Sequence, residues 1–328
     1  MTDAAPWQPE TTAEGLKRRA EILRRTRQFF AERDVLEVET PIACAYGVTE
    51  PHIRSIGFTH DSERWWLRSS PEYHMKRLLA AGSPDIYQIG KAFRGGERGS
   101  RHETEFTLVE WYRKGFTLAG LRDECCELII ELSRDSRQPV NHVQIHSYRE
   151  LFIDMCAIDP LDTDISALKS CAKKRLGGQL DEAFGSNPGM DQAAWLDLLA
   201  SHIIYPSFET NRLTVVTDYP KDQAMLARLN PESPELAERF EIFLNGIELA
   251  NGFHELDDSA EQAMRFERDR QRRRQLDLPD MLPDKELLAA LQVGLPSCCG
   301  VAVGLDRVIM VTDKHDHIRS TMSFAPGS

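Results

Sequence analysis

The segment RFEIFLNGIELANGFHEL, residues 239–256, carries Glu241, Glu248 and Glu255, with Asn251 among them, in a run that is otherwise mostly apolar. The Asn-Gly pair at 245–246 is a strong signal for a two-residue hairpin turn, because both turn positions require a positive φ. Such a turn places Glu241 opposite Ala250 and puts Glu241 and Glu248 on one face as diagonal neighbours. Two anions at this spacing repel each other unless a cation lies between them, and Mg²⁺ commonly takes one or two carboxylates together with phosphate oxygens.

Two other stretches carry residues of matching chemistry. Arg94 ends a predicted strand, a polar loop with Glu97 and His102 follows, and the returning strand carries Phe106. An arginine at a strand end can bind a phosphate or a carboxylate through two hydrogen bonds, and an aromatic side chain can stack on a base. The segment GVAVGLDR, residues 300–307, has glycines where a ligand or another backbone can approach a strand, and it ends in an arginine at a helix start.

Each stretch alone also fits a purely structural interpretation. Charged residues are mostly exposed, so the acidic hairpin fits a solvated edge, and the arginines and histidine fit a polar surface loop. The glycine-rich strand fits close packing followed by a surface salt bridge. Together, however, two arginines, a carboxylate pair, an aromatic and glycines predict a nucleoside triphosphate site that has no Walker loop.

Composition limits the function classes. The chain has 328 residues, of which 41% are hydrophobic and 28% charged, as in soluble globular proteins. Its 40 basic and 52 acidic residues give a net charge of -12, which opposes an extended nucleic-acid surface. The seven cysteines show no C-x-x-C spacing. Because there is no signal-peptide pattern and no apolar run of membrane-spanning length, we expect a cytoplasmic protein without a membrane partner.

The elements that must position these residues follow from periodicity and capping signals. An amphipathic helix is predicted to end near Asp34, and Ser70-Pro71 opens a second helix that runs to Gly82. Strands flank the loop after Arg94, a mostly helical insertion covers about 138–211, and strands return before a charged helix that begins at Asp258. We therefore predict a single α+β domain over residues 1–328, an antiparallel β-sheet flanked by helices.

Three segments resemble the signature motifs of class II aminoacyl-tRNA synthetases. VLEVETP at 35–41, FRGGERGSRHETEFTLVEWY at 93–112 and GVAVGLDR at 300–307 are similar to motifs 1, 2 and 3, in the order found in the lysyl enzyme. The resemblance covers about residues 16–311. Because only some fifteen residues precede the first predicted helix, we expect no OB-fold anticodon domain. In this respect the sequence resembles the lysyltransferase paralogues that modify elongation factor P.

The resemblance implies a function and a set of roles. It implies ATP-dependent activation of lysine or (R)-β-lysine as the adenylate and transfer to a lysine of elongation factor P, by a homodimer with a six- or seven-stranded antiparallel sheet and no tRNA partner. The cofactors implied are ATP and Mg²⁺. Two glutamates of the amino-acid pocket, Glu72 and Glu255, would each hold one ammonium group of the diamino acid. The implied site residues are Arg94 and Arg307 for catalysis; Ser70, Glu72, Tyr112, Asn251, Glu255 and Ala302 for the amino acid; Arg94, Glu97, His102, Phe106, Glu248 and Arg307 for ATP; and Glu241 and Glu248 for Mg²⁺.

The sequence departs from the family pattern in three places. Asp34 stands where motif 1 usually has glycine, and we interpret it as a left-handed helix stop. In motif 2, Gly96 replaces the usual glutamate, which leaves Glu97 as the predicted adenine contact, and HETEF at 102–106 replaces HNPEF. In motif 3, Ala302 replaces the middle glycine of the synthetases, as in the paralogues, and this favours β-lysine over α-lysine.

Two alternative functions remain at this point. The first is a truncated lysyl-tRNA synthetase-like enzyme that charges tRNA, which the acidic balance and the missing anticodon domain disfavour. The second is a non-catalytic regulator that binds amino acids. Such a regulator is expected to have lost Arg94, Arg307 or one of the hairpin carboxylates, and all of these residues are present.

Overall fold

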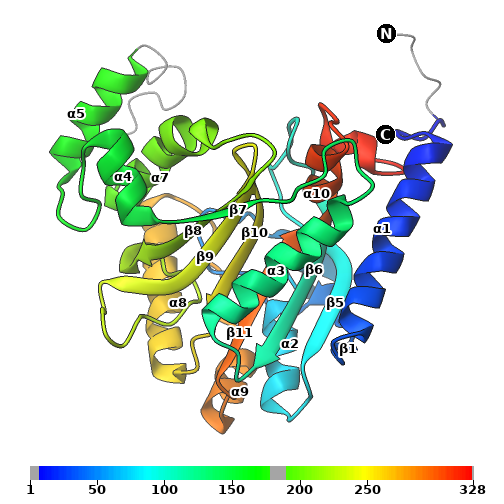
Figure 1. Ribbon diagram of the computed structural model, residues 1–328. Coiled ribbons are helices and arrows are strands. Elements are labelled where there is room, and N and C mark those ends of the chain that lie inside the picture. The colour runs from blue at the N-terminus through cyan, green and yellow to red at the C-terminus, as the bar shows by residue number, and fades with distance from the viewer. Residues whose placement is uncertain (1–6, 178–189, 327–328) are drawn as a thin grey trace.

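The computed structural model describes residues 7–177 and 190–326 and contains a large mixed sheet. Its strand order is β1-β5-β6-β11-β10-β9-β8-β7, and a small second sheet has the order β2-β4-β3 (Figure 1). The strands are β1 Leu36–Glu37, β2 Ala43–Cys44, β3 Ile56–His60, β4 Glu63–Leu67, β5 Ile86–Phe93, β6 Glu105–Lys114, β7 Val143–Ser147, β8 Leu213–Pro220, β9 Leu236–Leu244, β10 Ile247–His254 and β11 Cys298–Gly304.

The α+β class and the helix-flanked, mainly antiparallel sheet are confirmed, but the predicted strand count is wrong. In the described residues the large sheet has eight strands, and its two outer pairs, β1 with β5 and β7 with β8, are parallel. Parallel neighbours require a long crossover connection. The small sheet and a helix separate β1 from β5, and helices separate β7 from β8.

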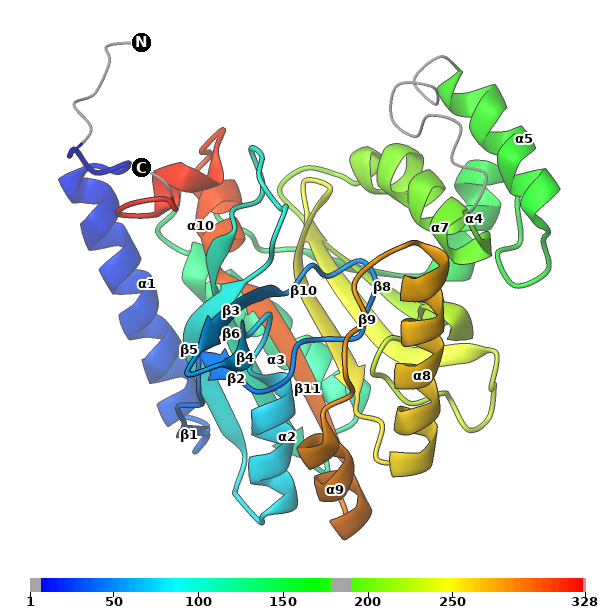
Figure 2. The ribbon, with the colours of Figure 1, turned by 180° about the vertical axis from the view of Figure 1, so that it is seen from behind.

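Helices cover both faces of the large sheet. On one face lie α1 (Ala13–Ala31), α3 (Leu118–Ser133) and α10 (Leu305–Thr312), which share the main core with the sheet; Figure 1 shows α3 in front of the strands and α1 along one edge. On the other face lie α2 (Glu72–Ala80), α8 (Ser259–Gln275) and α9 (Lys285–Val293), seen in Figure 2. Short 3₁₀ turns outside the insertion are η3 (Lys221–Gln223) and η4 (Ile318–Thr321).

The predicted insertion begins with a strand of the large sheet. After β7 come α4 (Tyr148–Cys156), α5 (Ile165–Leu176), α7 (Gln192–Leu199), the π-helix η1 (Ala200–Ile204) and η2 (Tyr205–Ser207). These helices share a hydrophobic core with Val216 of β8 and Phe243 of β9. Residues 178–189 of the predicted insertion lie outside the described residues.

Strand alternation divides the buried side chains between the two faces. In β6, Val109 and Trp111 point into the main core with Phe30 of α1, whereas Tyr112 packs with Met75 of α2 on the opposite face. Since successive side chains of a strand point to opposite faces, Glu110 shares the face of Tyr112. Polar residues at this period therefore face away from the main core.

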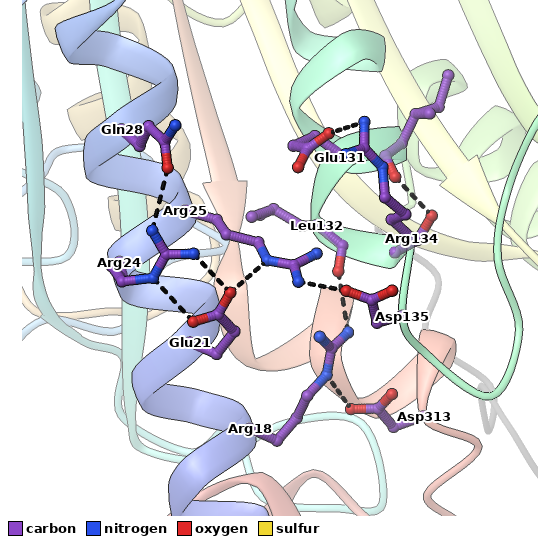
Figure 3. Close-up of polar contacts among 12 residues, drawn as sticks. Arg18, Glu21, Arg24, Arg25, Gln28, Glu131, Leu132, Arg134, Asp135 and Asp313 are labelled. Atoms are coloured by element: carbon purple, nitrogen blue, oxygen red, sulfur yellow. Dashed lines mark hydrogen bonds and ion pairs between the residues drawn. The ribbon is translucent and has the colours of Figure 1, made fainter.

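The N-terminal helix is fixed to the main-core face by polar contacts as well as by packing. Thr12 caps α1, and Asp34 has the predicted left-handed conformation, with φ 56°. Arg18 donates to the Leu132 carbonyl at 2.9 Å and pairs with Asp313 at 3.1 Å, while Arg25 pairs with Asp135 (Figure 3). These contacts join α1 to the C-terminal end of α3 and to the end of α10.

The acidic hairpin forms at the predicted turn, but its predicted register is wrong beyond Glu248. Glu248 pairs with Phe243 as expected, and then the register shifts, so that Ala250 lies opposite Ile242 and Asn251 lies opposite Glu241. A β-bulge adds one residue to a strand and changes the face of the residues that follow. Ala250 therefore joins the main core, and Asn251 instead occupies the position beside Glu241 that was predicted for Ala250.

Candidate active site

A cavity of about 780 Å³ lies on the sheet face opposite α1 and α3. Its lining contains every site residue predicted from the sequence: Ser70, Glu72, Arg94, Glu97, His102, Phe106, Tyr112, Glu241, Glu248, Asn251, Glu255, Ala302 and Arg307. These residues come from segments up to 237 positions apart, from Ser70 to Arg307. The fold thus brings the three predicted stretches together, while the role of each residue stays a prediction.

A continuous row of paired residues crosses the sheet, and its members from Glu110 to Glu241 line the floor of this cavity. Gln88 of β5 pairs with Glu110, Glu110 with Ala302, Ala302 with Asn251, and Asn251 with Glu241. Residues that pair directly across strands lie on the same face of a sheet. The methyl group of Ala302 therefore lies between the side chains of Glu110 and Asn251.

Gly300 allows the walls of the cavity to come together. It pairs with Tyr112 on one side and with Phe253 on the other. A Cβ at Gly300 would overlap both Oε1 of Glu255 and the ring of Tyr112. The sequence analysis expected a ligand or another backbone to approach this glycine, whereas the groups that approach it are these two side chains.

One end of the cavity is lined by Glu72 and Glu255, and these carboxylates contact a buried cation behind the cavity wall. Nζ of Lys76 lies 2.7 Å from Oε1 of Glu72 and 2.6 Å from Oε2 of Glu255. Glu255 follows β10, and Glu72 is in the first turn of α2, where a negative charge is favourable. Both predicted carboxylates thus lie within reach of one buried ammonium group, which the sequence analysis did not identify.

A third carboxylate belongs to the same region. Ser70 donates to Oε2 of Glu110 at 2.8 Å, and the Tyr112 hydroxyl donates to Oε1 at 2.7 Å. Burial, followed by the charge of Glu72, raises the pKa of the Glu110 carboxyl to about 7. Burial likewise raises the pKa of Glu255 to about 8, although Lys76 opposes the shift.

Glu241 is already paired within the protein. It accepts a hydrogen bond from the Tyr219 hydroxyl at 2.6 Å and forms an ion pair with Arg239. Arg239 also donates to Oδ1 of Asn251 at 3.2 Å. Burial raises the pKa of Glu241 to about 7 even though Arg239 lowers it.

The second hairpin carboxylate, Glu248, is more accessible and faces motif 3. Its side chain is 40% exposed and lies 3.6 Å from Nη1 of Arg307. Arg307 is placed by its neighbour Asp306, which accepts from the Thr107 amide at 2.6 Å and pairs with Arg19 at 2.6 Å. The first turn of α10 is thereby fixed against β6 and α1.

The residues present fit Mg²⁺ only with help from a ligand. Among the described residues, no group of three or more His, Cys, Asp or Glu side chains could hold a metal ion. Mg²⁺ is, however, usually held by one or two carboxylates with substrate phosphates and waters. Glu248 is the accessible carboxylate for this purpose. Glu241 would have to give up its ion pair with Arg239 in order to bind the metal ion.

The opposite end of the cavity has the features of a nucleotide site. The Arg94 guanidinium lies 5.2 Å from the centre of the Phe106 ring. Nε of Arg94 is buried and has no hydrogen-bond partner among the described residues. A buried donor without a partner is costly, and an anionic oxygen would satisfy it.

The departures in motif 2 have structural explanations. Gly96 has φ 80°, a conformation that favours glycine over glutamate. The amide of Gly95 donates to the Arg54 carbonyl at 2.7 Å, which fixes the loop against the segment before β3. Glu103, which replaces the expected asparagine, is buried and pairs with Arg319 at 3.1 Å.

Three residues of the site were missed by the sequence analysis, namely Lys76, Glu110 and Arg239. Each had a signal. Lys76 is four residues after Glu72 on a helix, the spacing of an ion pair. Glu110 is four residues after Phe106, and Arg239 is two residues before Glu241. Because residues at even spacing in a strand lie on the same face, each of these charged residues shares a face with a predicted site residue.

Comparison with known proteins gives consistent matches over nearly the whole chain. The family model "tRNA synthetases class II (D, K and N)" matches residues 6–327. A Vibrio cholerae protein named "Elongation factor P--(R)-beta-lysine ligase" is 43% identical over 325 residues, which are 97% of each chain. A protein of the same name from Haemophilus influenzae strain PittGG is 40% identical over 331 residues, 99% of each chain, and one from Pasteurella multocida is 38% identical over 330 residues, 99% of this chain and 98% of its own.

Proposed function

The chain belongs to the class II tRNA synthetases of the D, K and N group, and we propose that it is an ATP-dependent ligase that attaches (R)-β-lysine or lysine to a lysine side chain of elongation factor P. The names of the relatives support both the acceptor and the β-amino acid. One observation carries the proposal: a single cavity joins a buried acidic end at Glu72 and Glu255 to an arginine–aromatic end at Arg94 and Phe106.

The first step is activation of the amino acid. Its carboxylate oxygen attacks the α-phosphorus of ATP, so a new O–P bond forms, while the bond from that phosphorus to the α,β-bridging oxygen breaks and pyrophosphate leaves with its electron pair. Arg94 and Arg307 would stabilise the developing charge on the phosphates, and Phe106 would hold the adenine by stacking. Such catalysis consists of positioning and electrostatic stabilisation rather than covalent chemistry by the enzyme.

The second step transfers the activated acyl group. A neutral lysine amine of elongation factor P attacks the adenylate carbonyl, an amide bond forms, AMP leaves with the electron pair of the broken C–O bond, and the amine loses a proton. The acidic end at Glu72 and Glu255 would hold the two ammonium groups of a diamino acid. A buried cation requires such partners to offset its loss of hydration.

Mg²⁺ is part of the proposal. Bound beside the phosphates, it would supply charge neutralisation for the leaving pyrophosphate. Glu248 would hold it together with phosphate oxygens, with Glu241 as the second carboxylate. The accessible carboxylate of Glu248, 3.6 Å from Arg307, supports this arrangement.

The proposal extends to the setting of the enzyme. We place it in the cytoplasm, where ATP and the translation factor are found, as a homodimer formed around motif 1 and with no tRNA substrate. The strand of that motif, β1, is at the edge of the large sheet, and Leu36 is 51% exposed. Among the described helices, none combines the length and apolar character that a membrane span requires.

Mass spectrometry of elongation factor P tests the proposal directly. The factor is incubated with the enzyme, ATP and either lysine or (R)-β-lysine, and the expected product gains one lysyl or β-lysyl group with release of AMP. A parallel assay offers bulk tRNA. Charging of tRNA without modification of the factor would establish the synthetase alternative, and binding of the amino acid without AMP formation would establish the regulator.

A further inference from the structure

We propose that Lys76 is a positioning residue that holds the carboxylates of Glu72 and Glu255 together, favours their charged form and aligns them to receive the two ammonium groups of a diamino acid. This inference rests on the proposed function, because it assigns a role within the same amino-acid pocket. It explains how two buried carboxylates can stay close together and still bind positive charge, which the predicted roles of Glu72 and Glu255 left open.

The geometry is that of a bridge. Lys76 is on α2, one turn after Glu72, and its ammonium contacts Oε1 of Glu72 and Oε2 of Glu255, at 2.7 and 2.6 Å. The side chains of Lys76 and Glu255 are each only 2% exposed, and that of Glu72 is 15% exposed. Both carboxylates line the cavity, so each keeps one oxygen for a ligand while the other is held by the protein.

The surroundings make such a bridge necessary. Facing the bridge are Glu110 and Tyr112 from β6 and Cys298 from β11. None of them carries a positive charge. Buried carboxylates that share a site cannot all ionise without a counter-ion, and one of them takes up a proton instead. A protonated carboxyl group cannot serve as the anionic partner of an ammonium group.

Lys76 can supply this counter-ion at every physiological pH. Burial lowers the pKa of its ammonium group, but Glu255 and Glu72 raise it further, so the pKa lies above the ordinary value for lysine. Burial raises the pKa of Glu255 to about 8, and the charge of Lys76 acts against that shift. Removing the charge would therefore move the ionisation of Glu255 to higher pH.

The first test is Lys76→Met, which keeps the length of the side chain and removes its charge. Steady-state ATP–pyrophosphate exchange is measured with (R)-β-lysine or lysine across the neutral range. We expect the KM for the amino acid to rise about tenfold or more while kcat changes less, and the pH profile of kcat/KM to move upward by about 1 to 3 units. The control is Lys91→Met, which removes a half-exposed partner of Glu105. It should leave the KM for the amino acid and the pH profile of kcat/KM unchanged.

Two further variants separate positioning from a merely structural role. Lys76→Arg keeps the charge and should keep the wild-type pH midpoint even if its KM rises. Lys76→Met combined with Glu72→Gln removes one carboxylate as well, so the midpoint should return toward that of the wild type. The double variant also provides the measurement if Lys76→Met alone does not fold, as judged by circular dichroism.

The outcomes distinguish this inference from the proposed function. An unshifted pH profile in a folded variant that lacks the Lys76 charge, with kcat and KM altered together, would show that Lys76 is a packing residue. Failure of the wild type to activate either lysine isomer would instead overturn the proposed function, whatever the variants do.

Discussion

Ala302 and Glu110 lie directly opposite each other in the antiparallel register of β11 and β6. Because Asn251 occupies the other side of Ala302, the methyl group stands on the cavity floor between two polar side chains. Its surroundings are those of a binding surface, since Ala302 lines the cavity together with Glu255. A residue at this point can discriminate between substrates that differ by the position of one amino group.

We predict that the wild type prefers (R)-β-lysine and that Ala302→Gly moves the preference toward α-lysine. A methyl-sized feature is worth about 1 to 3 kcal/mol in discrimination, or roughly ten- to two-hundred-fold. The measurement is the ratio of kcat/KM for the two isomers in adenylate formation. The KM for ATP serves as the internal control, and an unchanged isomer ratio would mean that Ala302 is ordinary strand packing.

The second prediction concerns the close contact at Gly300. Gly300→Ala would place a methyl group against Oε1 of Glu255 and the ring of Tyr112. Because both side chains are buried, they cannot easily move, and we expect the KM for the amino acid to rise about tenfold or more. Gly99→Ala is the matched control, since a Cβ there meets no atom within 4 Å. Equal changes in the KM for ATP and for the amino acid would contradict a defect local to the pocket.

The third prediction tests the Mg²⁺ assignment. Glu248→Gln should abolish ATP–pyrophosphate exchange, or raise its Mg²⁺ requirement by about tenfold or more, without unfolding the protein, because this carboxylate is 40% exposed. Glu241→Gln should abolish exchange too, but it also weakens the ion pair with Arg239. Loss of a buried partner costs stability, roughly 1 to 3 kcal/mol, measurable by urea unfolding.

The control for the metal assignment is Glu238→Gln. Glu238 is on the same strand as Glu241 and pairs with Arg228 outside the cavity. We expect its exchange rate and Mg²⁺ requirement to match the wild type. Normal exchange in both Glu241→Gln and Glu248→Gln would remove the metal assignment and leave these carboxylates a structural role.

The fourth prediction is a pH dependence of amino-acid binding. The pKa values of Glu110 and Glu255 are raised to about 7 and about 8. A carboxyl group must lose its proton to hold an ammonium group, so kcat/KM for the diamino acid should rise as the pH rises through this range. The KM for ATP should vary much less. Glu255→Gln should abolish the upper step and weaken amino-acid binding by about 2 to 5 kcal/mol, and a wild-type profile that is flat from pH 6 to 9 would reject the assignment.

The sequence alone determined much of the local structure and predicted which side chains take part in the chemistry. Residue type and spacing predicted roles for Arg94, Phe106, Glu241, Glu248 and Arg307, because anion binding, base stacking and metal ligation each require particular side chains. The structure places all five in the lining of one cavity. The turn at 245–246, the stop at Asp34 and the cap at Asp258 also formed as predicted. Such features depend on interactions over a few residues, which a sequence displays directly.

The tertiary structure decided what depends on distant contacts. The bulge after Glu248 replaced Ala250 by Asn251 on the cavity floor, because packing against the main core fixes which face each residue takes. The parallel pairs at the two edges, β1 with β5 and β7 with β8, each require a long crossover connection. No local sequence pattern specifies where such a connection returns to the sheet. Lys76 is the clearest case: its pairing with Glu72 follows from helical spacing, but its contact with Glu255 spans 179 positions and exists only because α2 packs beside the end of β10.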